Sequence, residues 1–240
     1  MQLTIYNDYR ELSSHAADAI IDCIKNKPMA VICLASGDTP RLTCSLFVQK
    51  VLEEKIDLSH CTFIGLDEWV GIPPENEGSC HYFFHTYIFG PLKLSPTQFY
   101  LFDALSNNLA EQCRQMDKII ADKGGIDLMI VGAGMNGHIG FNEPGVSIKN
   151  YAHVIELDEI TQAVGQKYFN TPVTISKGIT LGLQHLLESK QVIMLANGTK
   201  KAPVIKKAME ETISTQFPAT VMRMHNNSLM MTDEEAASLL

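Results

Sequence analysis

One stretch of the sequence, residues 126–145, places polar side chains among closely spaced glycines, a pattern typical of a ligand-binding loop. It opens with an apolar run, residues 126–131, which is long enough for a strand buried on both faces and too short for a buried helix. Open α/β sheets bind ligands in the loops that follow such strands. A tight connection with incidental polar residues is the alternative. The groups that could bind or react are Asn136, His138, Asn142 and Glu143.

Acid–base chemistry is indicated by the histidine of this loop and by carboxylates on both sides of it. His138 precedes Glu143 by five residues, so a loop that folds back would let the carboxylate orient the imidazole and stabilise its charged form. Asp67 directly follows a predicted buried strand, residues 61–66, and is a candidate general base, with a capping role as the alternative. For the adjacent Glu68 we expect a solvated side chain.

Two further segments indicate that a phosphate is bound. Residues 36–40, Ser-Gly-Asp-Thr-Pro, form a predicted strand-to-helix turn whose free N–H groups could bind an anion. Lys201, in the first turn of a later helix, could complete a phosphate clamp. The alternatives are an ordinary helix cap and a solvated lysine pair with Lys200. The carboxylate of Asp38 would repel a phosphate that it faced, and Arg41 could offset that charge.

The elements that must position these groups alternate between strands and helices. This order predicts an α/β fold with a doubly wound, mostly parallel sheet and helices on both faces, Rossmann-like, so that the strand ends meet at one edge. The last strand is expected to lead into a helix capped by Asp233. The predicted strands are residues 1–6, 29–35, 61–66, 99–102, 126–131, 191–196 and 228–231. Residues 154–157 and 174–180 are also expected to be extended, and a short turn is expected between 180 and 191. The predicted helices are 9–25, 40–54, 81–87, 107–123, 160–169 and one that begins near 198.

Composition limits the class of protein. The chain has 240 residues, 45% apolar and 19% charged, without repeats or a linker, so we expect a single domain, 1–240, with a buried core. A net charge of -8 without a basic patch argues against nucleic acid or an anionic membrane as partner. No apolar run spans a bilayer and the N-terminus lacks a signal peptide, which favours a cytoplasmic protein. The six cysteines are scattered, which predicts reduced thiols and no metal site.

Taken together, these segments resemble the glucosamine-6-phosphate deaminase/isomerase family. The matching motifs follow one another along nearly the whole chain. They are residues 65–71 (GLDEWVG), 134–144 (GMNGHIGFNEP), 198–202 (GTKKA), 218–225 and 233–237.

The resemblance implies a reaction and a role for each residue. The substrate would be a 2-amino-2-deoxyhexose 6-phosphate, which is opened, isomerised by a proton shift from C2 to C1, and deaminated to a ketohexose 6-phosphate without metal or cofactor. Asp67 would carry the proton, His138 would protonate the ring oxygen, and Glu143 would hold His138. The phosphate would be bound by Ser36, Gly37, the backbone of Asp38, Thr39, Lys167 and Lys201.

Three positions depart from the family pattern. Asn136 stands where many relatives have aspartate, so it can orient His138 but adds no negative charge. Lys167, in an expected lid at residues 150–175, replaces an arginine and offers a point charge instead of a fork. Asp38 replaces a small residue. The last two changes look more like the galactosamine-6-phosphate branch, so the C4 epimer of the substrate stays open.

Two other functions fit the same architecture. A 6-phosphogluconolactonase would hydrolyse a lactone, which needs no proton shift between carbons, and the motif at 137–144 favours the deaminase. A sugar-phosphate-sensing domain of a transcriptional regulator would need a DNA-binding segment, and this chain starts directly on its first strand without a basic helix-turn-helix region. The expected partner is therefore a small sugar phosphate, with a homo-oligomer left open.

Overall fold

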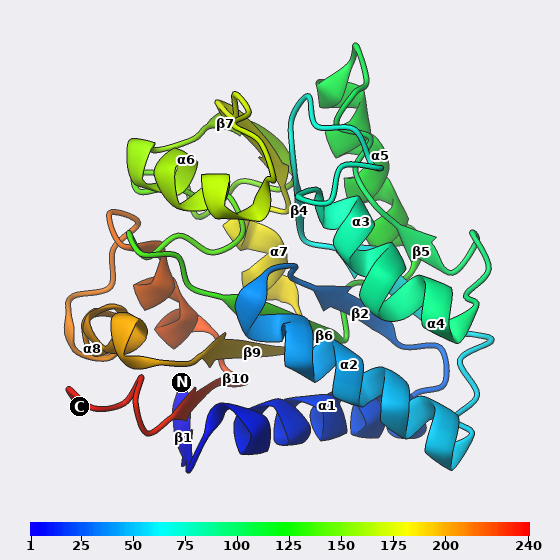
Figure 1. Cartoon of the computed structure of the whole chain (residues 1–240), viewed down its shortest axis with the longest axis horizontal. Coiled ribbons are helices and arrows are strands. Elements are labelled where there is room, and N and C mark those ends of the chain that lie inside the picture. The colour runs from blue at the N-terminus through cyan, green and yellow to red at the C-terminus, as the bar shows by residue number, and fades with distance from the viewer.

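A seven-stranded parallel sheet forms the centre of the molecule (Figure 1). The computed structural model describes all residues from 1 to 240. The strand order is β1-β10-β9-β6-β2-β3-β5 and every pairing is parallel, which confirms the predicted fold class. The strands are β1 (Gln2–Tyr6), β2 (Val31–Leu34), β3 (Thr62–Gly65), β5 (Phe99–Tyr100), β6 (Leu128–Gly132), β9 (Gln191–Ala196) and β10 (Ser228–Asp233).

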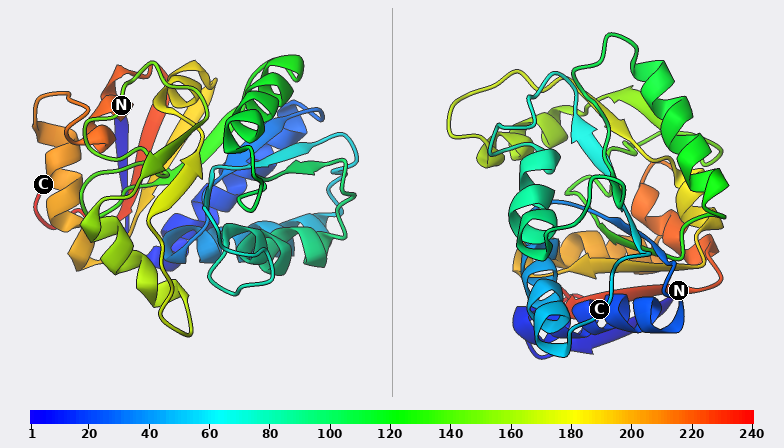
Figure 2. Two further views of the ribbon diagram at one scale, coloured as in Figure 1. Left: turned by 90° about the horizontal axis from the view of Figure 1, so that it is seen from above. Right: turned by 90° about the vertical axis from the view of Figure 1, so that its right-hand side faces the viewer.

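Helices cover both faces of this sheet, so neighbouring residues of its central strands are buried in two different cores (Figures 1 and 2). On β2, Ile32 and Leu34 belong to the first core, and Val31 and Cys33 belong to the second. Burial on both faces is what parallel strands with helical crossovers require. The first core contains α1 (Tyr9–Asn26) and α2 (Asp38–Glu54), and the second contains α5 (Leu109–Asp122) and α8 (Ala202–Glu210).

A second, three-stranded antiparallel sheet lies beyond the carboxyl ends of the main strands. Two of its strands overlap the segments expected to be extended, 154–157 and 174–180, but their pairing with the residues after β3 was not predicted. Its order is β4-β8-β7, with β4 (Asp67–Trp69), β7 (His153–Glu156) and β8 (Lys177–Thr180). The short helix α6 (Glu159–Gly165) and a helical turn, Gln166–Tyr168, lie between β7 and β8. The expected lid is therefore a segment whose two ends are fixed in one small sheet.

Two expectations about local structure are wrong. Asp233 ends β10 and is followed by turns and not by the expected helix, although its carboxylate accepts hydrogen bonds from the N–H groups of Gly198 and Ala236. A helix, α7 (Leu183–Glu188), stands where only a turn was expected. The aromatic helix is split into α3 (Cys80–Phe84), a π-helical turn (His85–Phe89) and α4 (Gly90–Leu92).

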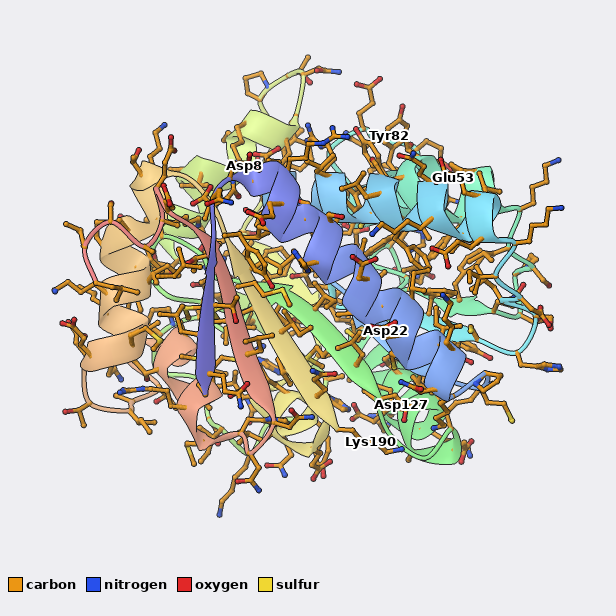
Figure 3. All side chains as sticks on the ribbon, turned by 90° about the horizontal axis from the view of Figure 1, so that it is seen from below. Asp8, Asp22, Glu53, Tyr82, Asp127 and Lys190 are labelled. Atoms are coloured by element: carbon orange, nitrogen blue, oxygen red, sulfur yellow. The ribbon has the colours of Figure 1, made fainter.

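At the amino-terminal edge of the sheet, the buried carboxylate of Asp127 pairs with two partly exposed lysines. Asp127 immediately precedes β6, and its carboxylate accepts from Lys27 and Lys190 at 2.7 Å each (Figure 3). The N–H of Val31 donates to the same carboxylate at 2.8 Å. This cluster lies at the opposite end of the strands from the predicted site.

None of the helices combines the length and the apolar character needed to span a bilayer.

Candidate active site

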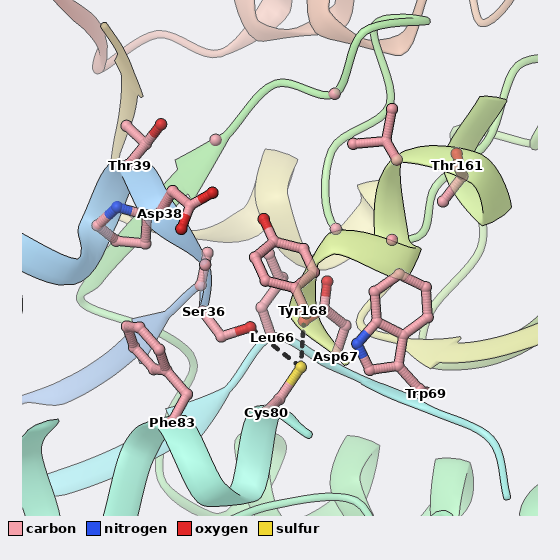
Figure 4. A pocket seen from close by; sticks show the side chains of 18 of the residues that line it. Ser36, Asp38, Thr39, Leu66, Asp67, Trp69, Cys80, Phe83, Thr161 and Tyr168 are labelled. Atoms are coloured by element: carbon pink, nitrogen blue, oxygen red, sulfur yellow. Dashed lines mark hydrogen bonds between the residues drawn. The ribbon is translucent and has the colours of Figure 1, made fainter. Parts of the chain in front are cut away.

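A cavity of about 450 Å³ opens at the carboxyl ends of β2, β3 and β6 (Figure 4). The chain leaves β2 toward β3 on one side, while β6 lies on the other, so the strand order changes direction here and leaves a crevice. Asn136 and Glu143 do not line the cavity. The other eight predicted site residues do: Ser36, Gly37, Asp38, Thr39, Asp67, His138, Lys167 and Lys201.

Of the two adjacent carboxylates Asp67 and Glu68, only Asp67 lines the cavity, and Glu68 lies buried beside it. Burial, with the charge of Glu68 added to it, raises the pKa of Asp67 to about 7. Asp67 is therefore partly ionised near neutral pH and can both take up and release a proton. Its side chain faces the cavity and forms no ion pair.

The expectation that Glu68 is solvated is wrong. Its side chain is only 1% exposed and accepts backbone N–H groups from Trp69, Cys80 and His81 at 2.8 to 3.0 Å. Burial raises its pKa to about 7 even though these three donors act in the opposite direction. Glu68 thus anchors the start of α3 next to Asp67.

A thiol that the sequence analysis did not single out connects two predicted site residues. The hydroxyl of Ser36 donates to Sγ of Cys80 at 3.0 Å, and the thiol lies 3.6 Å from Oδ1 of Asp67 (Figure 4). Burial, followed by the charges of Glu68 and Asp67, raises the pKa of the Cys80 thiol well above its usual range. The thiol is therefore protonated and can donate to the Asp67 carboxylate.

His138 is held at Nδ1 by Thr161, which also lines the cavity, and by Glu143, which does not. Its Nδ1 lies 3.0 Å from the hydroxyl of Thr161 and 3.5 Å from Oε2 of Glu143, and the Asn136 amide donates to Oε2 at 2.8 Å. Burial acts to raise the pKa of Glu143. Hydrogen bonds with His138, Thr161 and Asn136, together with the charge of His138, outweigh burial and lower that pKa. Glu143 is therefore an ionised partner placed to orient the imidazole ring.

The other imidazole nitrogen of His138 requires a glycine at position 134. A Cβ placed on Gly134 would lie 2.2 Å from Nε2, closer than any side chain could be accommodated. The missing side chain lets the ring pack directly on the backbone after β6. The loop thus folds back as expected. Glu143 contacts the His138 ring and Asn136 contacts Glu143, but neither residue lines the cavity.

The predicted phosphate loop and Lys201 lie together on one wall. No side chain caps the first turn of α2, so its N–H groups are available to an anion. The Lys201 ammonium donates to the carbonyl of Ala133 at 2.6 Å, and burial, with the charge of Lys167, lowers its pKa to about 8. The Thr39 hydroxyl already donates to Asn197 at 2.8 Å, so its backbone is the freer donor.

The lid contacts this loop through an ion pair and a tyrosine. Lys167 lies 2.8 Å from Asp38, and the same carboxylate pairs with Arg41 at 2.8 Å. The Tyr168 hydroxyl lies so close to Gly37, whose φ is +110°, that a Cβ there would approach it to 3.1 Å. Asp38 therefore faces two cations, while the cavity retains a net positive wall. No cluster of three His, Cys, Asp or Glu side chains is arranged to hold a metal ion.

Three residues that complete the cavity escaped the sequence analysis: Cys80, Thr161 and Tyr168. Tyr168 follows Lys167 directly, so the lid prediction already pointed to its neighbourhood. Nothing in the local sequence distinguishes Cys80 or Thr161 from ordinary helix residues, because their contacts reach segments 13 to 44 residues away.

Comparison with known proteins finds similarity along the whole chain. The family model "Glucosamine-6-phosphate isomerases/6-phosphogluconolactonase" matches residues 8–231. Over 241 residues the chain is 36% identical to glucosamine-6-phosphate deaminase of Clostridium perfringens (strain 13 / Type A), covering all of both chains. It is 34% identical to glucosamine-6-phosphate deaminase 1 of Bacillus subtilis (strain 168), with 96% of each chain covered.

Solved structures show the same relationship. A structure described as a monomeric glucosamine-6-phosphate deaminase superposes with a TM-score of 0.96 at 34% identity, with both chains fully covered. The 6-phosphogluconolactonase of Trypanosoma brucei superposes with a TM-score of 0.79 at 19% identity, covering 100% of this chain and 98% of that one. At that identity the second likeness concerns the fold alone.

Proposed function

The chain belongs to the glucosamine-6-phosphate isomerase/6-phosphogluconolactonase family as an amino-sugar-phosphate deaminase, and we propose that its cavity converts a 2-amino-2-deoxyhexose 6-phosphate to a ketohexose 6-phosphate and ammonia. One observation carries the proposal. A carboxylate of raised pKa, a histidine backed by a carboxylate, and a cationic wall with free helix N–H groups all face one cavity.

The first step is opening of the sugar ring. His138, as imidazolium, donates its proton to the ring oxygen while the C1–O5 bond breaks and the C1 hydroxyl passes its proton to water, which leaves an aldehyde at C1. The imidazole then regains a proton from water. Glu143 orients the ring and does not line the cavity that would hold the sugar. An open chain is needed because the C2 proton becomes acidic only beside a carbonyl carbon.

The second step is the proton shift. Asp67, ionised, removes the proton from C2 of the aldehyde, whose amino group enters as ammonium, while one ammonium proton passes through water to O1, which gives a neutral enolamine. The carboxylic acid of Asp67 then returns its proton to C1, which leaves a hydroxymethyl group at C1 and an iminium at C2. One carboxylate can serve both neighbouring carbons because they lie on the same face of the opened sugar. Water adds to C2 and ammonia departs, so one water is consumed for each ammonia released.

The phosphate anchors the sugar at the opposite wall of the cavity. We assign it to the backbone of residues 36–39 and to Lys201, with Lys167 approaching from the lid. A phosphate dianion would also offset the burial that lowers the pKa of Lys201. Lys201→Ala should therefore raise KM for the phosphorylated sugar, and equal affinity for the unphosphorylated sugar in wild type would contradict the assignment.

The decisive experiment is an ammonia-release assay with glucosamine 6-phosphate and galactosamine 6-phosphate, run beside 6-phosphogluconolactone hydrolysis. We expect ammonia from an amino sugar phosphate, and we take the glucosamine epimer first because the relatives are named for it. Faster turnover of the galactosamine epimer would assign the enzyme to that branch. Lactone hydrolysis without ammonia release would overturn the proposal.

We further propose that one protomer carries a complete site in the cytoplasm. The solved relative of TM-score 0.96 is described as monomeric, and eight of the ten predicted site residues of this chain line one cavity. The six cysteines are all free, which suits a reducing compartment. Sedimentation at assay concentration, measured beside activity, tests whether one protomer is sufficient. Specific activity that rises with the dimer fraction would contradict a complete site in one protomer.

A further inference from the structure

The mechanism above leaves one polar group of the cavity floor without a task, the thiol of Cys80. Its residue is 4% exposed, and its backbone N–H is fixed by Glu68 at 3.0 Å, immediately beside the base. The thiol lies 3.6 Å from Oδ1 of Asp67 and is the only hydrogen-bond donor to that carboxylate. From the other side it accepts the Ser36 hydroxyl at 3.0 Å.

These contacts form a chain from the phosphate loop to the base: Ser36 hydroxyl, Cys80 thiol, Asp67 carboxylate (Figure 4). Resting on the proposed function, we propose that Cys80 is a positioning residue that holds Asp67 toward C1 and C2 and links it to the phosphate loop. A phosphate that accepts the Ser36 hydroxyl withdraws that donor from the Cys80 sulfur. Phosphate binding at the loop therefore alters the hydrogen bond between the Cys80 thiol and the Asp67 carboxylate.

The chemical state of the thiol supports this role. Burial keeps it protonated, so it acts as a donor and neither attacks a substrate nor binds a metal. Its hydrogen bond lowers the pKa of Asp67 against the much larger effect of burial. A thiol is a weak donor, so it fixes one carboxylate oxygen while leaving Asp67 able to accept a proton near neutral pH.

The test compares Cys80→Ala with Cys80→Ser through the pH dependence of kcat/KM. Loss of the donor in Cys80→Ala should move the acidic limb to higher pH by about half a unit, because one hydrogen bond to a charged group is lost. Cys80→Ser keeps a donor and should restore the limb. Cys113→Ala removes a buried thiol outside the cavity and serves as the matched control.

A purely structural role would lower activity or stability equally at every pH, so an unmoved limb in Cys80→Ala would overturn the proposal. The link to the phosphate loop is tested with Ser36→Ala, whose effect on the limb should vanish in the Cys80→Ala background; additive shifts would overturn it. Carboxyl ¹³C titration of Asp67 in the substrate-free protein measures the same displacement without turnover. It therefore separates failure of this proposal from failure of the proposed function.

Discussion

Asp67 and Asp127 are aspartates at opposite ends of one parallel sheet, and their surroundings give them opposite acid–base properties. Asp127, 6% exposed, receives two lysines and a backbone N–H, which outweigh the effect of burial and lower its pKa. Asp67 receives a single thiol donor, and burial raises its pKa to about 7. Low accessibility alone therefore does not raise the pKa of a carboxylate toward neutrality. The absence of a counter-charge is also needed.

The difference also separates stability from chemistry. Three donors hold Asp127 in one ionised state, so it can pin strands together but cannot exchange a proton near neutral pH. Asp67 is left poorly compensated, which costs stability and leaves it near the pH at which a proton can be both taken and returned. Glu143 is intermediate, since its partner His138 can gain a charge.

The largest expected effect is on turnover and concerns Asp67, the aspartate without a counter-charge. Asp67→Asn removes the proposed base, so kcat/KM should fall by about 10³-fold while the sugar phosphate still binds. Ammonia release and binding calorimetry measure the two quantities. Asp127→Asn is the matched control, with kcat and KM close to wild type. Ammonia release by Asp67→Asn at the wild-type rate would refute the role of Asp67.

The reverse test removes the counter-charged carboxylate. Asp127→Ala leaves the Val31 N–H without its acceptor and separates Lys27 and Lys190 from theirs, so the free energy of unfolding should fall by about 2 kcal/mol. The two lysine side chains are 41% and 61% exposed and can be solvated, which keeps the cost at the lower end. Urea unfolding measures it. A loss of kcat in the folded protein would contradict the assignment of Asp127 to stability alone.

The intermediate carboxylate should give an intermediate effect on rate. Glu143→Gln keeps the shape but removes the charge that favours the His138 imidazolium, so ring opening should slow about 10-fold. Because C2 deprotonation would then no longer limit the rate, the kinetic isotope effect of a C2-deuterated substrate should decline toward one. An unchanged rate with an unchanged isotope effect would remove Glu143 from the mechanism.

The two aspartates should also change stability with pH in opposite directions. The raised pKa of Asp67 means that the folded state keeps a proton that the unfolded state has lost between about pH 4 and 7, so stability falls as pH rises through this window. Asp127 has a lowered pKa, so its contribution is lost as pH falls below about 4.

Asp67→Asn removes the destabilisation at neutral pH. The variant should unfold with a free energy higher than wild type by about 4 kcal/mol at pH 8, and equal to it near pH 4. Thermal melts at pH 4, 6 and 8 measure this difference. A constant offset at all three pH values would show that Asp67 does not titrate in this range.

The smallest effect is expected at the exposed rim, where Asp38 pairs with Lys167 across a half-exposed contact. Asp38→Asn frees the lysine and removes a charge that repels phosphate, so KM should fall about two- to five-fold. Inhibition by inorganic phosphate should strengthen in parallel. Asp122→Asn, which breaks the exposed pair with Lys118 on α5, is the control. A higher KM in Asp38→Asn would show that the carboxylate itself contacts the substrate.

The sequence by itself determined the sheet, the order of its elements and the loops that face one another. Apolar runs of strand length alternate with helical segments, and parallel strands joined by right-handed crossovers bring their carboxyl ends to one edge. The position of Asp67 after β3 and the glycines around His138 are local features, so both residues could be selected before any contact was known.

Only the tertiary structure decided the environment of each group. Glu68 was expected in solvent, yet the N–H groups of α3 hold it inside; Cys80 reaches Ser36 and Asp67 across segments that share no local pattern. Burial and counter-charge arise from residues distant in the chain, and together they set the pKa of a carboxylate. Sequence spacing therefore locates a candidate base, whereas the packing of remote segments determines whether it can act as one.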